Sequence, residues 1–444
     1  MAKLFGTDGI RGRANSWLSP ELAQGIGRAA ASYLGGKSGG TILIGRDPRL
    51  SGAMLEGALA SGVASVGINV RLAGVVTTPA LAWLTKNTGA IAGAMISASH
   101  NPMEDNGIKF VNSQGFKLED AQEQAIEEMF FRGQELPRPT GENVGHILRD
   151  EAIIEKYCNY LLASIQQPLT GIKVIVDCAN GSASGIARQV FARAGAEVET
   201  IHASPDGINI NRSCGSTHPA ALAAAVRAKK ADLGLALDGD ADRLIAVDAQ
   251  GEIVDGDKIM LICARELKQQ GKLHDDTLVV TVMSNLGLQL AAKKMGIKTV
   301  STKVGDRHVL EEMLRGGYTL GGEQSGHIIF RQFATTGDGL LSALQLMQVM
   351  VHSGKSLREL AEVMEYLPQV LVNVPVASKE GWQDNQRIAE KMAWAEAELQ
   401  GQGRVLVRPS GTEPLIRVML EGPQKAELET LAQAIAEVIK GEQG

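Results

Sequence analysis

The chain has 444 residues, a formal net charge of −6 and a sequence pI near 5.9. Its length exceeds the roughly 250–300 residues at which a single hydrophobic core stops growing, so we expect several domains. The acidic balance excludes nucleic acid as the main partner, because no block of Lys and Arg supplies the positive stripe that a phosphate backbone requires.

Cysteine usage and hydropathy favour a cytoplasmic protein without a membrane partner. The four cysteines are scattered and lack the Cys-x-x-Cys spacing of a zinc site, which fits reduced thiols better than a disulfide framework. The N-terminus carries no apolar signal segment, and no stretch approaches the roughly 20 continuous apolar residues of a membrane span.

The first motif in the chain is FGTDGIRG at residues 5–12, a glycine-punctuated loop whose cation is Arg11. It is either a tight turn with a solvated arginine or a site for an anion, and the loop alone does not decide between the two. Beyond it, helical patterns at 23–34 and 54–66 flank an apolar strand at 41–47. Strands that alternate with helices predict a parallel sheet with right-handed crossovers.

The next motif follows an apolar strand and reads GAMISASHNP at 93–102, continuing to NGIKF at 106–110. The Asn-Pro pair breaks the strand, so we expect a sharp turn that exposes the Ser99 hydroxyl at the carboxyl end of the strand. A reactive serine needs a base, a nearby cation or conversion to phosphoserine, which adds roughly two negative charges. The alternative is a polar loop with a capping serine.

Two later segments, at 172–181 and 277–287, repeat the pattern of an apolar strand, a small polar turn and a helix start. The C-terminal part differs, because strand-like runs at 404–408 and 415–420 precede a terminal helix with one apolar face. We therefore expect an α/β fold in which three similar mixed α/β domains are followed by a smaller C-terminal α+β domain. The expected domains are 1–150, 151–250, 251–366 and 367–444.

A carboxylate cluster stands in LDGDADR at 237–243, where Asp238, Asp240 and Asp242 occupy alternate positions after an apolar strand. Three like charges this close repel one another unless a cation neutralises them, and ligation by oxygen alone suits Mg²⁺. An EF-hand is excluded, because its sixth position would be Arg243 rather than glycine. The alternative is an acidic surface turn.

The segment GGEQSGH at 321–327 offers a carboxylate, an amide, a hydroxyl and an imidazole between glycines. Sugar hydroxyls or an amine require such donors and acceptors, so Glu323, Ser325 and His327 are candidate substrate-binding residues. Lys303 is a further candidate, although a solvated helix start explains its segment, KVGDR, equally well. For the GGEQSGH loop the alternative is a polar turn.

A compact anion site is indicated by RPSGTEP at 408–414 together with a second arginine just beyond it. Two guanidiniums, two hydroxyls and the backbone N–H groups around a glycine suit phosphate better than a plain hairpin turn does. A nucleotide P-loop is excluded, since the Gly-Lys-Ser triplets at 36–38 and 354–356 lack the required earlier glycine. The candidate phosphate ligands are Arg408, Ser410, Gly411, Thr412 and Arg417.

Taken together, these loops comprise a serine that can be phosphorylated, a magnesium triad, a sugar-binding loop and a phosphate site. In this motif order the sequence resembles the α-D-phosphohexomutase family over essentially its whole length. Within the family, the loops at 5–12, 96–102 and 321–327 look most like the bacterial branch that acts on glucosamine phosphates. The branch that acts on mannose and glucose phosphates usually carries Met where Gln324 stands and Thr where Ser97 stands.

The resemblance implies four domains around one cleft, with Ser99 as the phosphoserine. It implies one Mg²⁺ per chain, bound by Ser99, Asp238, Asp240 and Asp242, and it implies sugar recognition by Glu323 and Ser325. The resemblance also places Arg11, His100 and Lys109 around the transferred phosphoryl. Either His100 or Lys109 is expected to handle the hydroxyl proton.

The implied activity is the interconversion of glucosamine 6-phosphate and glucosamine 1-phosphate, which supplies amino-sugar and cell-wall precursors. Glucosamine 1,6-bisphosphate is expected as intermediate and activator, and a kinase or another phosphoryl donor must first charge Ser99. Whether the protein forms a homodimer stays open. The alternatives are a mutase for glucose or mannose phosphates and a non-catalytic sugar-phosphate sensor, although a mere binder needs neither the serine nor the Asp triad.

Overall fold

The computed structural model describes residues 4–6, 8–35, 39–132, 136–410 and 414–444. The chain forms two compact units, one made of Met1–Met283 with Ile297–Val363 and the other of Ser284–Gly296 with Met364–Gly444. Within the described ranges, every helix is too short or too polar to cross a membrane.

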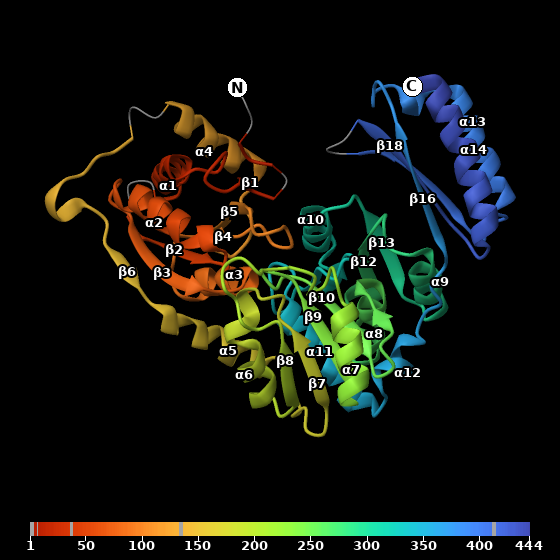
Figure 1. Cartoon of the computed structure of the whole chain (residues 1–444), viewed down its shortest axis with the longest axis horizontal. Coiled ribbons are helices and arrows are strands. Elements are labelled where there is room, and N and C mark those ends of the chain that lie inside the picture. Colours follow the sequence, from red (N-terminus) through yellow and green to blue (C-terminus); the bar gives the residue numbers. More distant parts are fainter. Residues whose placement is uncertain (1–3, 7, 36–38, 133–135, 411–413) are drawn as a thin grey trace. The chain divides into compact units, whose positions relative to one another are not determined.

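The first sheet of the larger unit has six strands in the order β1-β5-β4-β2-β3-β6. Their bounds are Ile10–Arg13 (β1), Thr41–Arg46 (β2), Asn69–Val75 (β3), Ala92–Ile96 (β4), Asp105–Asn112 (β5) and Ile147–Arg149 (β6). The helices that accompany them are Pro20–Gly35 (α1), Leu50–Ala64 (α2), Thr78–Asn87 (α3) and Asp120–Arg132 (α4). Because the chain passes from β2 to β3 in one direction and then back across β2 to β4, right-handed crossovers put α2 and α3 on opposite faces of the sheet (Figure 1).

The parallel neighbours β2 and β4 mark the point at which the strand order reverses, and their register pairs Arg46 with Ile96. The loops that follow the two strands leave toward opposite faces, which opens a crevice at the carboxyl edge of the sheet. Residues 47–49 and 97–99 therefore begin side by side in that crevice, although about 50 positions of sequence separate them. The sheet topology alone places the SASHNP motif at a ligand-binding position.

The second and third sheets repeat this plan, with the strand orders β11-β10-β9-β7-β8 and β13-β12-β14-β15. The strands of the second are Lys173–Asp177 (β7), Glu197–Ile201 (β8), Leu233–Leu237 (β9), Leu244–Asp248 (β10) and Ile253–Val254 (β11). Those of the third are Thr277–Thr281 (β12), Lys298–Thr302 (β13), Leu320–Gly322 (β14) and Ile328–Phe330 (β15). In each of the three sheets a crossover strand ends in an antiparallel hairpin, formed by β4–β5, β9–β10 and β14–β15. The expectation of three similar mixed α/β domains is confirmed.

Side-chain caps begin several helices of the larger unit. Its further helices are Ile154–Ala163 (α5), Ala187–Arg193 (α6), Ala220–Lys229 (α7), Gly256–Gln269 (α8), Asp306–Gly316 (α10), Gly339–Ser353 (α11) and Leu357–Ala361 (α12). Thr77 accepts a hydrogen bond from Ala80 N at 3.1 Å at the start of α3, and Asp338 accepts one from Leu341 N at 3.0 Å at the start of α11. These bonds satisfy backbone donors that have no partner within the helix.

The smaller unit is an antiparallel sheet covered by two helices, and it includes the segment that carries α9. Its elements are Leu286–Lys294 (α9), Gln369–Pro375 (β16), Gln386–Glu398 (α13), Arg404–Pro409 (β17), Leu415–Glu421 (β18) and Lys425–Gln443 (α14), with the strand order β16-β18-β17. The apolar face expected for the terminal helix is buried at Leu428, Leu431 and Ile435. Asn285, at the start of α9, donates to the buried Glu421 carboxylate at 3.1 Å, which ties this helix to the C-terminal sheet.

Candidate active site

Ser99 lies directly after β4 in a left-handed backbone conformation, with φ of 51°. Its Oγ donates a hydrogen bond to Asp238 Oδ2 at 2.7 Å, and the residue is only 2% exposed. The expectation of an exposed hydroxyl is therefore wrong, because the carboxylate from the β9–β10 hairpin covers it. The left-handed conformation costs on the order of 1 kcal/mol for a residue with a side chain, so the surrounding contacts must hold it.

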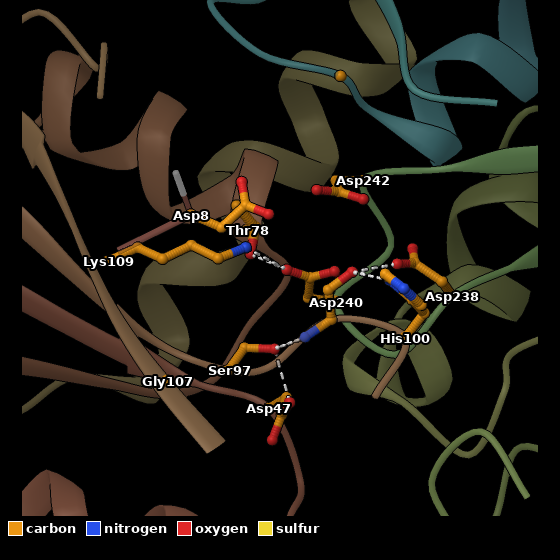
Figure 2. A network of polar contacts seen from close by, with 12 residues as sticks. Asp8, Asp47, Thr78, Ser97, His100, Gly107, Lys109, Asp238, Asp240 and Asp242 are labelled. Atoms are coloured by element: carbon orange, nitrogen blue, oxygen red, sulfur yellow. Dashed lines mark hydrogen bonds and ion pairs between the residues drawn. The ribbon is translucent and has the colours of Figure 1, made fainter. Parts of the chain in front are cut away.

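Ser97 has a different role from its neighbour two residues on. Its Oγ donates to Asp47 Oδ2 at 2.7 Å and accepts the Ser99 backbone N–H at 3.0 Å. Figure 2 shows Ser97 joined to Asp47 below the carboxylates of the β9–β10 hairpin. Since its hydroxyl is buried and used in both directions, it is Ser99 rather than Ser97 that presents its oxygen to that hairpin.

The three aspartates of the β9–β10 hairpin are all buried, and each offers one carboxylate oxygen within 4.8 Å of the others. Burial, together with the charges of Asp242 and Asp240, raises the pKa of Asp238 well above its usual range. One oxygen each of Asp240 and Asp242 accepts no hydrogen bond from any residue in the described ranges. Converging buried carboxylates with oxygens that accept no hydrogen bond fit a divalent cation with oxygen ligands.

A cation and a hydroxyl from the first α/β domain contact this triad, and a second cation lies beside Asp8. Lys109 on β5 is buried with its Nζ 3.3 Å from Asp240 Oδ2, and Thr78 Oγ1 donates to the same oxygen at 2.6 Å (Figure 2). Arg11 on β1 lies 3.5 Å from an oxygen of Asp8. Positive charge at these positions suits the binding of a phosphoryl group beside Ser99.

His100 points its Nδ1 toward Ser99 Oγ at 3.4 Å. Burial, followed by the positive charges of Arg243 and Arg11, lowers the pKa of this imidazole. A neutral ring at neutral pH can accept a proton, which is the property required of a general base next to a hydroxyl. The structure places His100 next to Ser99, the residue with which the family resemblance groups it.

The β14–β15 hairpin carries the candidate sugar-binding loop. Glu323 is half-buried and its Oε1 accepts a hydrogen bond from Gly305 N at 3.0 Å, while the exposed Ser325 donates to Glu323 Oε2 at 3.3 Å. Lys303 is exposed shortly before α10, two residues from Gly305. The loop therefore presents a carboxylate and a hydroxyl that are accessible to solvent.

His327, at the end of the same loop, is buried and faces inward. Its Nδ1 lies 3.5 Å from Asp242 Oδ2, and its Nε2 accepts the Gly337 backbone N–H at 2.9 Å. Burial opposes a charged imidazole, but the carboxylates of Asp242 and Asp306 raise the pKa of His327 to about 9. The Gly337 N–H that Nε2 accepts favours instead the neutral ring with its proton on Nδ1. The imidazole thus contacts a candidate metal ligand, whereas the sequence pattern had suggested a substrate contact.

Comparison with known proteins shows to which family the chain belongs. Models of the phosphoglucomutase/phosphomannomutase domains match along the chain, with alpha/beta/alpha domain I at residues 2–137, domain II at 155–251, domain III at 255–367 and the C-terminal domain at 371–438. The chain belongs to the phosphoglucomutase/phosphomannomutase family.

Curated members of the phosphoglucomutase/phosphomannomutase family resemble this chain over its full length. It is 54% identical over 446 residues to a phosphoglucosamine mutase of Symbiobacterium thermophilum, with 100% of both chains covered. A phosphoglucosamine mutase of Halalkalibacterium halodurans is 53% identical over 445 residues, again with 100% of both covered.

Solved structures of the family share the fold at lower sequence identity. A Burkholderia thailandensis phosphoglucomutase/phosphomannomutase family protein superposes with a TM-score of 0.83 at 24% identity, covering 99% of this chain and 97% of its own. Aspergillus fumigatus N-acetylphosphoglucosamine mutase, solved with GlcNAc-6P and magnesium, gives a TM-score of 0.70 at 18% identity, with 100% and 97% covered. The four-domain architecture of the family is therefore present here.

The smaller unit of this family member carries the candidate phosphate ligands. Arg408 on β17 and Arg417 on β18 are directly paired across the two strands. Burial and then the charge of Arg417 lower the pKa of Arg408. Like charges opposite each other destabilise a strand pair, and an anion bound between them would relieve this repulsion. Ser410 is buried beside them, whereas Gly411 and Thr412 lie outside the described residues.

Sequence reasoning missed several residues that surround the reacting loops. Arg243 follows the Asp triad, is half-buried and has an Nε that hydrogen-bonds to no residue of the described chain. Arg49 and Asn211 both contact the backbone of Ser99, from distant parts of the sequence. The polar turn after the strand at 41–47 was the only local signal for Arg49, and Asn211 had none.

Proposed function

We propose that the chain interconverts glucosamine 6-phosphate and glucosamine 1-phosphate through a phosphoserine at residue 99. The contact that carries the proposal is the 2.7 Å hydrogen bond from Ser99 Oγ to Asp238, which puts a serine hydroxyl on a buried carboxylate triad. The full-length relatives at 54% and 53% identity, both phosphoglucosamine mutases, support the choice of substrate. The step would supply amino-sugar precursors of the cell wall.

In the forward direction the phosphoryl leaves Ser99 Oγ and bonds to the free sugar hydroxyl, which yields glucosamine 1,6-bisphosphate. The hydroxyl proton passes to His100, whose lowered pKa keeps the ring neutral, and from there to the Ser99 oxygen that the phosphoryl leaves. In the second half-reaction the other phosphoryl of the bisphosphate returns to Ser99 Oγ, which restores the phosphoenzyme and releases the product. Phosphoryl transfer asks the protein mainly for positioning and charge neutralisation, and Arg11 and Lys109 supply positive charge beside Ser99.

We assign the Asp triad to Mg²⁺, one ion per chain, with Ser99 as a further ligand once it is phosphorylated. The support is the donor set, since Asp238, Asp240 and Asp242 offer only oxygens and two of those oxygens accept no hydrogen bond from the described residues. When bound, Mg²⁺ would neutralise charge on the transferred phosphoryl. His327 would hold Asp242 in place through its Nδ1 proton.

Substrate recognition is assigned to two regions. Glu323 and Ser325 would read the sugar hydroxyls or the amine, with His327 at the end of the same loop and Lys303 in the segment before α10 as further candidates. In the smaller unit, Arg408, Ser410 and Arg417 would bind phosphate, and the sequence adds Gly411 and Thr412. A cradle of guanidiniums recognises phosphate itself rather than its attachment point, which suits a substrate that carries it at either end.

The first turnover requires that Ser99 already carries phosphate. We propose that glucosamine 1,6-bisphosphate, a kinase or another phosphoryl donor supplies it in the cytoplasm, where the four free cysteines stay reduced. A homodimer is proposed as one assembly, and its test is the solution mass. The expected domain limits, 1–150, 151–250, 251–366 and 367–444, remain proposals for the design of truncated chains.

Two measurements test the proposal. The purified chain is assayed with the 6-phosphates of glucosamine, glucose and mannose, and kcat/KM should be highest for glucosamine 6-phosphate. A higher value for glucose or mannose phosphate would move the chain to the other branch of the family. Intact mass should show an added phosphate that is lost in Ser99→Ala, and absence of turnover with all three sugars would leave a sugar-phosphate sensor.

A further inference from the structure

Arg49, just before α2, has one of the most completely buried side chains of the described chain, at 1% exposure. Its Nε donates to Asp47 Oδ2 at 2.8 Å, and Nη2 donates to the carbonyl oxygens of Ser99 and Asn101, both at 2.9 Å. Nη1 donates to the carbonyl oxygens of Pro102 and of Asp105, the latter at 3.1 Å. All five N–H donors of the guanidinium are therefore used, four of them on the backbone of one loop.

Asn211, from the loop after β8, reaches the same loop from the second domain. Its Nδ2 donates to the Ser99 carbonyl at 2.8 Å and to the Asn101 carbonyl at 3.1 Å. Both partners are acceptors only, so the amide must present its NH₂ group to them. Each of the two carbonyl oxygens thus receives one bond from Arg49 and one from Asn211, which fills both of its lone pairs.

The β9–β10 loop, which carries the Asp triad, is the third segment that packs against the Ser99 carbonyl. A Cβ placed on Gly239, between Asp238 and Asp240, would lie 2.5 Å from the Ser99 carbonyl oxygen and 2.9 Å from Asn211 Nδ2. Only a glycine can pass this close to both groups. The backbone of the Asp triad therefore packs directly against the clamped carbonyl.

These contacts determine which polar groups of the loop face the reacting phosphoryl. With φ of 51°, Ser99 is strained, and its N–H is also bound through Ser97 to Asp47, which in turn pairs with Arg49. A carbonyl dipole turned toward a phosphoryl would repel it, and four hydrogen bonds hold the two carbonyls elsewhere. In a planar trans peptide the His100 N–H points opposite to the Ser99 carbonyl, and it hydrogen-bonds to no residue in the described parts of the chain.

We propose that Arg49 and Asn211 are positioning residues for phosphoryl transfer, a two-sided clamp on the Ser99 and Asn101 carbonyls. The clamp keeps Ser99 in its left-handed conformation, turns both carbonyls away from the phosphoryl and leaves the His100 N–H available to it. The inference rests on the proposed role of Ser99 as the phosphoserine. Neither residue touches the substrate, so each acts through the backbone of the loop.

Asn211→Asp is the sharpest test, because it keeps the size of the side chain and its tolerance of the left-handed backbone at φ of 58° while it replaces the donor by a carboxylate. We expect kcat to fall about a hundredfold with KM for glucosamine 6-phosphate changed less than about threefold, as for a misplaced reacting group. Asn211→Gly, which removes the whole side chain at a left-handed position that glycine adopts readily, should cost about tenfold, since Arg49 still holds both carbonyls.

Asn209→Asp is the matched control, with the same chemical change in the same loop. Its Nδ2 donates to Ser204 O at 3.0 Å, within its own loop. The control should keep kcat within about twofold. Arg49→Lys keeps the charge but has three donors rather than five, and should lose more kcat than Asn211→Gly; where it does not fold, the Asn211 variants decide.

The readouts are kcat, KM, the rate of a single turnover from the phosphorylated enzyme measured by quench-flow, and the thermal midpoint of each full-length variant. The clamp is overturned if Asn211→Asp keeps wild-type single-turnover rates, or if Asn209→Asp loses as much kcat as Asn211→Asp. Ser99→Ala runs in parallel. If it keeps activity, the phosphoserine assignment fails first; if it is inactive while Asn211→Asp is not, the clamp alone fails.

Discussion

The β4–β5 loop that carries Ser99 and the β14–β15 loop that carries Glu323 occupy equivalent places in two similar sheets, but they are held very differently. The backbone oxygen of Ser99 accepts two hydrogen bonds, its N–H and Oγ each donate one, and the residue is buried. Glu323 is half-buried and is oriented by one backbone N–H and one exposed hydroxyl. In the proposed mechanism the nucleophile has one required position, whereas the sugar loop meets a substrate that carries phosphate at either end and must accept more than one partner geometry.

The largest effect is expected from a substitution in the tightly held β4–β5 loop. Ser99→Ala should lower kcat by several orders of magnitude, because no other hydroxyl of the described chain donates to Asp238. Ser97→Ala removes a support rather than the nucleophile and should cost roughly tenfold. A coupled assay for glucosamine 1-phosphate measures both. Equal losses in the two variants would leave the choice between the serines unsupported.

A smaller loss of activity is expected from a substitution in the Asp triad. Asp240→Asn removes a charge and an oxygen that receives Thr78 and Lys109, so activity should fall by roughly a hundredfold and excess Mg²⁺ should restore part of it. EDTA should abolish turnover of the wild type, and Zn²⁺ should replace Mg²⁺ poorly, since zinc prefers nitrogen and sulfur ligands. Full activity after extensive chelation would exclude a required metal.

Substitutions in the more loosely held β14–β15 loop should change mainly KM. Glu323→Gln keeps the shape of the side chain but weakens pairing with an ammonium, so KM for glucosamine 6-phosphate should rise about tenfold with a smaller change in kcat. Ser325→Ala, at an exposed position, should change KM about twofold to threefold. If Glu323→Gln lowered kcat alone, this loop would belong to the chemical step, and the contrast between the two loops would disappear.

The smallest effect concerns the support behind the β14–β15 loop, where Gly337 N binds His327 and Asp338 caps α11. Burial raises the pKa of Asp338 from 3.8 to about 6 in the folded chain. Between these values the folded state keeps a proton that the unfolded chain has released, so this group makes stability fall as pH rises from about 4 to 6.

Asp338→Asn should flatten that part of the stability profile, by on the order of 3 kcal/mol at most between its ends. Urea unfolding at closely spaced pH values measures the difference in slope between variant and wild type. A variant slope identical to that of the wild type would show that Asp338 does not hold its proton. Tyr157→Phe, which removes the donor to Asp338 at 2.7 Å, should steepen the fall.

The parts of the site that the sequence could predict are those whose signal is local. Alternating carboxylates in LDGDADR and a strand that ends in SASHNP identify the Asp triad and Ser99 from a few adjacent residues. Arg49 and Asn211 could not be predicted, because their partners lie 50 and 112 positions away and neither residue type is unusual on a protein surface. The burial of Ser99 was missed for the same reason, since Asp238 comes from another sheet, 139 positions along.

The three equivalent hairpins, β4–β5, β9–β10 and β14–β15, divide the work of one enzyme among three copies of one supersecondary unit. Duplication of an ancestral unit followed by divergence of the hairpin tips would produce such a chain, with the strands and crossovers left largely unchanged. Selection can then act on one tip at a time. In the proposed mechanism a change of sugar would act mainly on the third hairpin tip, while Ser99 and the three aspartates are retained, so substrate preference is expected to evolve faster than the chemistry it serves.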